Sequence, residues 1–410
     1  MAHSRVGMSA PKPLFGEGLL ENPYPVYRRF LDEGPLHFVN YKNGAWAFFA
    51  HCECSMAIRD PRLSARRTGL FALTLPPEQR AEFAELGRLL GLWMLFMDAP
   101  EHSRLRKLMN RGFSPAAVES LRPRVEAIVE RMLDRLENAA EADLMDAIAY
   151  PLPMLVISEM LGIPEAMHQK LLEWTDAIAQ FFGVPGAQTP ETMRPARAAE
   201  SALTGFFREA VAERRKHKGT DLISLVLDIE EDGDVLTEEE VYAQCVMLLF
   251  GGHETTRNLV GNGMLTLLRH PTALAELREN PGLIRSAVEE LLRYESPVQY
   301  TARIAKEDME TCGVRLCAGE PLLFILGAAN RDAQQFREPD RLDLGRVTNP
   351  HLAFGAGAHF CIGNQLARLE GQVAILQLAK RFPRMKLAQP RAEWVPNSVL
   401  RGLRVLPVTL

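Results

Sequence analysis

The chain has 410 residues, of which 47% are hydrophobic and 24% charged, and its formal net charge is −5. A chain of this size and composition can bury a large core and needs no disulfide or metal ion to fold. Its negative charge balance argues against a nucleic-acid binder held by an overall positive field.

The cysteine spacing and the hydropathy pattern predict a cytoplasmic protein. The six cysteines form no Cys-x-x-Cys pair and no zinc-finger spacing, which favours reduced thiols. There is no apolar run of about 20 residues, the length that a membrane span requires. The N-terminus lacks the apolar core of a secretory signal. We therefore expect no membrane anchor.

The N-terminal half predicts a small β region followed by helices. Residues 1–20 are expected to form a flexible arm, and Asn43-Gly44 is a strong hairpin signal. Asp98 is expected to cap the helix that follows it. The predicted elements are a helix over 23–33, strands over 36–41 and 45–50, and helices over 98–111, 115–138, 165–182 and 196–217.

The C-terminal half predicts one unusually long helix. Thr237 and Glu240 form a capping-box pattern, and apolar residues continue to Arg269, a length of about 48 Å. The other predicted elements are a helix over 283–294, strands over 310–316 and 321–326, a glycine-rich loop over 354–363, a helix ending at Arg381, and strands over 386–387 and 403–406. The fold class is therefore mainly α with a small β region.

One cysteine, Cys361, lies between the glycine-rich loop and the start of the last helix. A helix N-terminus favours negative charge, so we expect the pKa of this thiol to fall. A buried structural cysteine, a catalytic nucleophile with a histidine partner, and an axial ligand of haem iron are all compatible with this position.

The stretch Phe354-Gly-Ala-Gly-Ala-His-Phe-Cys361-Ile-Gly363 resembles the haem-binding signature of the cytochrome P450 family, Phe-x-x-Gly-x-x-x-Cys-x-Gly, in full. The resemblance implies a haem b cofactor with Cys361 as axial iron ligand, and it places Phe354, Gly355 and Gly363 at the cofactor. It further implies a P450 fold, with the haem between a long distal helix and the cysteine-loop helix, and one catalytic domain over 21–410.

The long helix contains Gly251-Gly252-His253-Glu254-Thr255-Thr256, although each glycine inside a helix costs about 1 kcal/mol relative to alanine. The helix either breaks here or continues with a distorted turn beside a ligand, and the apolar residues on both sides favour continuity. The segment resembles the oxygen-binding stretch of the family. That resemblance implies catalytic roles for Gly251 and Gly252, for Glu254 as proton relay and for Thr255 as hydroxyl donor.

Further charged residues match the family in order and spacing. Glu290 and Arg293 fit its Glu-x-x-Arg helix, and Arg341 fits the segment whose arginine joins that pair, so this trio is expected to brace the cysteine loop. Similar Glu-x-x-Arg spacings, including Glu254/Arg257, are more typical of exposed ion pairs. The two haem propionates need buried cations or donors. The candidates for this role are His102, Arg106, Arg303 and His359.

The resemblance also implies an apolar substrate pocket opposite Cys361. The candidate residues come from 86–95 and from four later segments: Leu92, Phe181, Phe182, Phe250, Val298, Gln299, Val399 and Leu400. The implied activity is insertion of one oxygen atom of O2 into a C–H bond or an alkene. The implied substrate is a polyketide, a macrolide or another secondary metabolite.

The chain contains no dinucleotide-binding fingerprint and no iron–sulfur cysteine spacing, so no fused reductase is expected. The resemblance implies electrons from a ferredoxin and an NAD(P)H-dependent reductase. Our hypothesis is that the ferredoxin docks near the thiolate face, at the basic residues Arg104, Lys107, Arg111 and Arg368. Two alternatives stay open. They are a peroxide-driven peroxygenase, which Glu254-Thr255 argues against, and a haem-binding sensor or carrier without turnover.

Overall fold

The computed structural model describes residues 10–16, 18–72, 75–183, 189–228, 230–231 and 234–410. The helices are α1 Tyr24–Glu33, α2 His51–Ala57, α3 Gly69–Ala72, α4 Pro77–Gly91, α5 Glu101–Met109, α6 Pro115–Glu119, α7 Arg122–Asp134, α8 Pro151–Met160, α9 His168–Phe182, α10 Pro190–Lys216, α11 Leu222–Asp228, α12 Glu238–Arg269, α13 Pro271–Glu279, α14 Ile284–Tyr294, α15 Leu326–Ala329 and α16 Asn364–Arg381. Short helical turns occur at Met94–Phe96, Met145–Ala149, Glu165–Met167, Pro281–Leu283 and Gly357–His359.

The strands are short and form a minor part of the fold. They are β1 Leu36–Val39, β2 Ala45–Phe48, β3 Leu63–Ser64, β4 Glu141–Asp143, β5 Glu230–Glu231, β6 Asp234–Val235, β7 Thr301–Ala305, β8 Met309–Thr311, β9 Val314–Leu316, β10 Pro321–Phe324, β11 Lys386–Leu387, β12 Glu393–Trp394, β13 Leu403–Val405 and β14 Pro407–Thr409. The predicted fold class, mainly α with a small β region, is confirmed.

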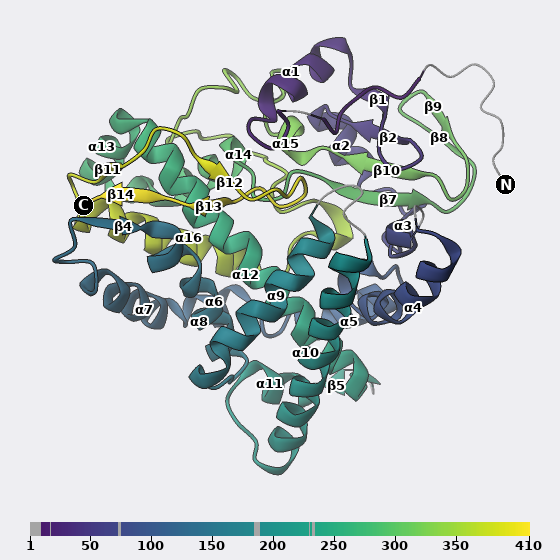
Figure 1. Ribbon diagram of the computed structural model, residues 1–410, viewed down its shortest axis with the longest axis horizontal. Coiled ribbons are helices and arrows are strands. Elements are labelled where there is room, and N and C mark those ends of the chain that lie inside the picture. Colours follow the sequence, from purple (N-terminus) through teal and green to yellow (C-terminus); the bar gives the residue numbers. More distant parts are fainter. Residues whose placement is uncertain (1–9, 17, 73–74, 184–188, 229, 232–233) are drawn as a thin grey trace.

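The largest sheet joins strands near the N-terminus, within 36–64, to strands within 301–324. Its strand order is β1-β2-β10-β7-β3, and β10 pairs in parallel with β2 and antiparallel with β7. Figure 1 shows this sheet with α1, α2 and α15 on one side of the molecule, and the long helices on the other. A second sheet, β11-β14-β4, pairs the C-terminal strand with a strand between α7 and α8.

The helix α12 runs through the centre of the helical part. Thr237 and Glu240 form the predicted capping box, and the helix continues for 32 residues, so one unbroken helix is confirmed. Its first half, 241–250, packs in one apolar cluster, and its second half, 259–267, packs in another. The turn containing Gly251 and Gly252 is regular α-helix, so the expected distortion is wrong. Here the Thr255 hydroxyl donates to the carbonyl of Gly251 at 2.7 Å.

Residues 1–9 and 17 of the expected flexible arm lie outside the described residues, and in the described part Lys12 pairs with Val39 and Leu14 is 2% exposed. Two expectations about the N-terminal half need correction. The predicted helix 115–138 is divided into α6 and α7. Asp98 does not cap α5, because its carboxylate accepts hydrogen bonds from the Ser64 hydroxyl and the backbone N–H of residue 65.

None of the helices in the described ranges has the length and apolar character needed to cross a membrane.

Candidate functional site

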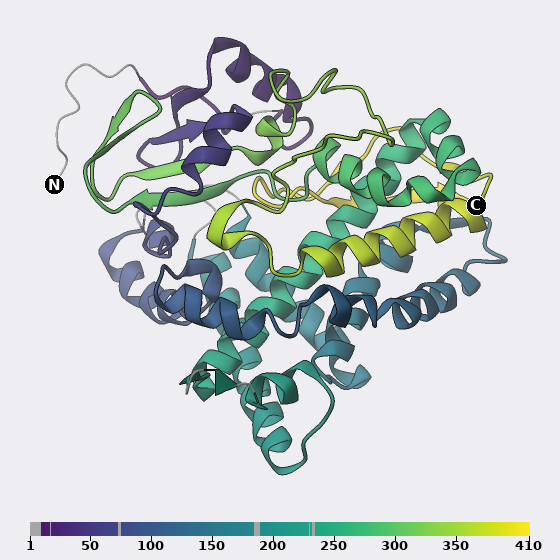
Figure 2. The ribbon, with the colours of Figure 1, turned by 180° about the vertical axis from the view of Figure 1, so that it is seen from behind.

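The loop that carries Cys361 is closed on itself by backbone hydrogen bonds. The Cys361 N–H donates to the carbonyl of Phe354 at 3.0 Å, and the Asn364 side chain donates to the carbonyl of Cys361 at 2.7 Å. Gly355 and Gly357 have φ values of 70° and 71°, the left-handed region that glycine adopts without strain. The loop leads directly into α16, the yellow-green helix at the front of Figure 2. It thereby fixes the thiol against the cavity described below.

Burial raises the pKa of the Cys361 thiol, whereas the backbone N–H of Gly363 and the guanidinium groups of Arg106 and Arg368 act in the opposite direction. The expected fall in this pKa is therefore wrong. Desolvation of a thiolate outweighs a helix N-terminus and two cations that do not touch the sulfur. A thiolate at this position needs a more direct positive partner, such as a bound metal ion.

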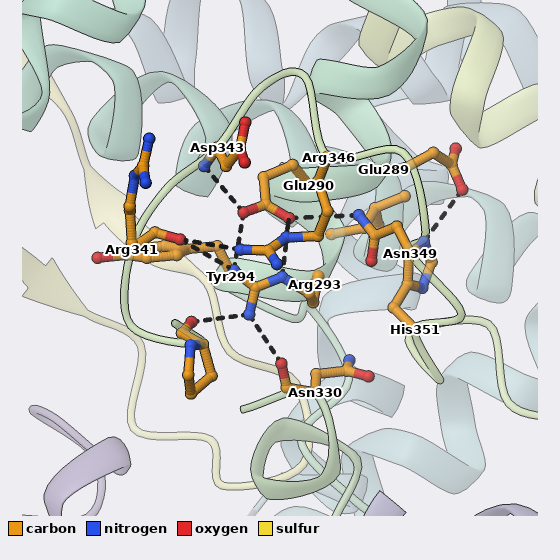
Figure 3. A network of polar contacts seen from close by, with 12 residues as sticks. Glu289, Glu290, Arg293, Tyr294, Asn330, Arg341, Asp343, Arg346, Asn349 and His351 are labelled. Atoms are coloured by element: carbon orange, nitrogen blue, oxygen red, sulfur yellow. Dashed lines mark hydrogen bonds and ion pairs between the residues drawn. The ribbon is translucent and has the colours of Figure 1, made fainter. Parts of the chain in front are cut away.

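Behind the loop lies a buried network centred on Glu290, shown in Figure 3. Glu290 and Arg293 are both fully buried and form a bidentate pair with N–O distances of 2.7 and 2.8 Å. Arg293 also donates to the carbonyls of Asn330 and Pro339. The Asn330 side chain accepts from the backbone N–H of Leu352 at 2.7 Å. The network therefore connects α14 to the start of the cysteine loop.

The third member of this network, after Glu290 and Arg293, is Arg346 and not Arg341. Arg346 Nε lies 3.0 Å from Glu290 Oε2, and its side chain is 10% exposed. The Arg341 side chain is 64% exposed and pairs with Glu338, while only its backbone carbonyl accepts from Arg293. The predicted trio is therefore wrong for Arg341, and Arg346 takes its place. Residues 337–349 are irregular, so no helical or strand periodicity could indicate which arginine points inward.

A second ion pair supports the loop from α16. Arg368 Nε lies 2.6 Å from Glu289 Oε1, and the guanidinium lies 4.4 Å from the centre of the Phe354 ring. Although burial alone would raise it, hydrogen bonds from His351 and Arg368 hold the pKa of Glu289 at about 2. Arg368 is thus engaged with the loop, which does not fit the expected docking role. Arg104 is likewise paired, with Glu240.

A cavity of about 370 Å³ lies between Cys361 and α12. Gly251, Gly252 and Thr255 line it from α12, and a Cβ atom added at Gly251 would meet no other atom within 4 Å. Five predicted pocket residues line the cavity: Phe182, Phe250, Val298, Val399 and Leu400.

Three predicted pocket residues do not line the cavity. Phe181 is fully buried in the core, Gln299 hydrogen-bonds to the Tyr27 hydroxyl, and Leu92 packs outside the lining. Residues that the prediction missed include Phe71, Phe96, Met247 and Leu248. Met247 and Leu248 lie four and three residues before Gly251 on the same helix, so the helical repeat could have indicated them. Phe71 lies in the short helix α3 and Phe96 in the helical turn Met94–Phe96, and both elements are too short to show a helical repeat.

All four predicted propionate partners, His102, Arg106, Arg303 and His359, line this cavity. The two imidazole rings lie 4.0 Å apart between their centres, and burial lowers the pKa of Arg303 to about 10 and that of His359 to about 2. Among the described residues, no aspartate or glutamate lines the cavity. Cations concentrated on a buried wall without carboxylates favour a ligand that brings its own anionic groups. The two propionates of haem b fit this requirement.

The acid of α12 lies beside the cavity and not on its lining. Glu254 is 3% exposed, and its carboxylate lies 2.9 Å from Arg257 Nη1. Arg257 Nη1 is also 3.5 Å from Asp176, which accepts a hydrogen bond from the Tyr150 hydroxyl. Burial raises the pKa of Glu254 to about 7, against the opposing charge of Arg257. The Glu254/Arg257 spacing, which the sequence offered as a typical exposed pair, is therefore a buried one.

A profile described as "Cytochrome P450" matches residues 79–396 of this chain. The biotin biosynthesis cytochrome P450 of Bacillus subtilis is 38% identical over 95% of this chain and 96% of its own length. The cytochrome P450 monooxygenase PikC of Streptomyces venezuelae is 39% identical over 100% of this chain and 97% of its own. The crystal structure of P450BioI with an acyl carrier protein ligated to hexadec-9Z-enoic acid has a TM-score of 0.89 at 37% identity, covering 96% of this chain and 98% of that one.

The corrected network predicts a clear difference between two neighbouring arginines. Arg346→Ala should lower the free energy of unfolding by about 2 kcal/mol, the contribution of a buried hydrogen bond to a charged group. Arg341→Ala should change it by less than about 0.5 kcal/mol, since its guanidinium is exposed. Urea unfolding of the two holoproteins measures both values, and equal losses would contradict the assignment of Arg346.

The raised pKa of Glu254 predicts a pH dependence of stability. Its folded value of about 7 exceeds the ordinary value of 4.5, so the folded protein retains a proton that the unfolded chain releases between these values. Wild-type stability should therefore fall as pH rises through this window. Glu254→Gln lacks this titrating group. As pH rises from 5 to 8, the free energy of unfolding of the variant should therefore increase relative to that of the wild type. Urea unfolding at each pH tests this, with the exposed Glu101→Gln as control. A pH-independent difference would refute it.

Proposed function

This chain belongs to the cytochrome P450 family, and we propose that it inserts one oxygen atom of O2 into a C–H bond or an alkene of an apolar secondary metabolite. The enzyme is a monooxygenase, and its cofactor is haem b. The observation that carries the proposal is one cavity bounded by Cys361, by a cationic wall and by the glycine and threonine turn of α12. Residues 21–410 would act as one catalytic domain, which the pairing of β2 with β10 and of β4 with β14 supports.

The residues of this chain have distinct tasks toward the haem. Cys361 would supply the axial thiolate, and His102, Arg106, Arg303 and His359 would hold the propionates. When bound, the haem would supply the site at which O2 is activated, while the redox partner supplies two electrons and solvent supplies two protons. The Glu290 and Glu289 networks would keep the cysteine loop in position while the haem enters.

Proton delivery would depend on Glu254 and Thr255. A carboxyl group whose pKa is about 7 both binds and releases a proton at neutral pH, as a relay requires. Arg257 and Asp176 continue from Glu254 toward solvent, since Asp176 is 39% exposed. Thr255 would present its hydroxyl to the cavity by releasing the carbonyl of Gly251, to which it now donates.

The cavity supports an apolar substrate of small to medium size. Its lining on the α12 side is aromatic and aliphatic, with Phe71, Phe96, Phe182 and Phe250 among its residues. Related proteins include the polyketide biosynthesis cytochrome P450 PksS of Bacillus subtilis and the vitamin D(3) 25-hydroxylase of Pseudonocardia autotrophica. A polyketide, a macrolide or a similarly apolar metabolite is the substrate class that we propose for this chain.

Turnover experiments test the proposed activity. A metabolite that shifts the haem absorbance should be oxidised when ferredoxin, its reductase and NAD(P)H are supplied. Thr255→Ala should slow product formation by about 10²-fold, which is the lower end of the rate contribution of a positioned proton donor. The electrons from NAD(P)H should then form hydrogen peroxide in place of product. Thr266→Ala, at a buried threonine of α12 that does not line the cavity, is the matched control and should stay close to wild type. Product from peroxide alone would favour a peroxygenase, and binding without product would favour a sensor or carrier.

Bacterial P450 enzymes use redox partners. We propose a ferredoxin as the partner here, docking near the C-terminal end of α5, where Lys107 and Arg111 are exposed. The Arg104 and Arg368 side chains are only partly exposed, so we place the docking patch at the more exposed Lys107 and Arg111.

Charge reversal tests the docking site. The double variant Lys107→Glu/Arg111→Glu should slow reduction by ferredoxin about tenfold at low ionic strength, and the difference should shrink as salt screens the charges. The substrate-induced absorbance shift should not change. Arg315→Glu, an exposed arginine on β9, is the matched control. Unchanged reduction rates with an unchanged salt dependence would place docking elsewhere.

A further inference from the structure

A third arginine, Arg67, lines the cavity together with Arg106 and Arg303. It lies in the connection between β3 and α3. Its Nη1 donates to the backbone carbonyls of Ala65 and Leu95, at 3.1 and 3.2 Å, and the guanidinium lies 4.7 Å from the centre of the Phe96 ring. These contacts hold the side chain in one place, but each partner is electrically neutral.

No ion pair neutralises Arg67 within the described part of the chain. Its neighbour Arg66 differs in this respect, because Arg66 points outward and lies 3.0 Å from Glu101. Burial, together with the smaller effect of the nearby charge of Arg303, lowers the pKa of Arg67 to about 9. A desolvated cation without a counter-charge is costly, so such a side chain is retained where a ligand supplies the anion.

The cavity has one more guanidinium group than haem b has propionates. Haem b carries two propionates, and Arg106 and Arg303 would provide one guanidinium for each of them. Arg67 adds a third permanent cation to the same wall, on the side of Arg303 and His359, whose pKa it helps to lower. It also borders the aromatic part of the cavity through Phe96. The guanidinium can therefore reach a propionate or the acidic end of a substrate.

We propose that Arg67 binds a carboxylate inside the cavity, either a haem propionate shared with Arg303 or a carboxylate carried by the substrate. This inference rests on the proposed haem-dependent function. It adds a binding residue that the sequence motifs did not indicate, because Arg67 lies in a connection without a recognisable pattern.

The test compares Arg67→Gln and Arg67→Lys with the matched control Arg66→Gln, using the holoprotein. One measurement is the rate of haem transfer from the ferric protein to excess apomyoglobin. The other is the dissociation constant of dodecanoic acid and of dodecan-1-ol, from the absorbance shift that each causes. These two probes have the same chain length and differ in charge. Thermal unfolding of each variant shows that it is folded.

If the carboxylate belongs to the haem, Arg67→Gln should transfer haem to apomyoglobin about tenfold faster, because one charge-assisted hydrogen bond is lost. Arg67→Lys should transfer haem more slowly than Arg67→Gln, because lysine keeps the positive charge. If the carboxylate belongs to the substrate, Arg67→Gln should raise the dissociation constant of dodecanoic acid about tenfold and leave that of dodecan-1-ol unchanged. Both results support the proposal and distinguish its two sources.

Arg67→Gln that equals Arg66→Gln in both measurements would overturn the proposal. A wild-type protein that takes up no haem would instead refute the proposed function, so the two failures are distinguishable.

Discussion

The position of Cys361 depends on one buried carboxylate that two guanidinium groups share. Glu290 has no contact with solvent, and its charge is balanced by Arg293 and Arg346. Buried charges are stable only when their partners are placed well, so this group restricts the conformation of everything attached to it. Through Asn330 and Leu352 the restriction reaches the cysteine loop. A loop rich in glycine would otherwise be the most mobile part of the site.

The cavity separates three kinds of chemistry in space. Cations are concentrated on one wall, apolar and aromatic side chains form another, and the acid Glu254 lies outside the lining, next to Arg257. This arrangement follows from desolvation. A carboxylate inside the cavity would neutralise the cations that a haem requires, whereas a carboxylate on α12 but outside the lining can exchange protons without competing for them. The position of the acid thus preserves the positive wall for the cofactor.

Features set by local pattern could be predicted from the sequence, and features set by long-range packing could not. The capping box before α12, the continuity of that helix and the pairing of Glu290 with Arg293 follow from spacings within a few residues. The choice between Arg341 and Arg346 depends on an irregular segment. Phe181 and Phe182 are adjacent on α9, yet only Phe182 reaches the cavity, because successive helical residues point about 100° apart. The pKa of Cys361 depends on burial, which no motif expresses.

The central turn of α12 differs mechanically from both of its ends. On either side of it the helix is fixed by a separate apolar cluster, while Gly251 has open space where a side chain would be. Bending α12 therefore costs the least free energy near its midpoint, because neither apolar cluster has to rearrange there. A molecule that enters the cavity can deform the helix locally while both ends remain anchored. The two glycines would then be the point at which the helix bends, and the hydrogen bond from the Thr255 hydroxyl to the Gly251 carbonyl would resist this bending.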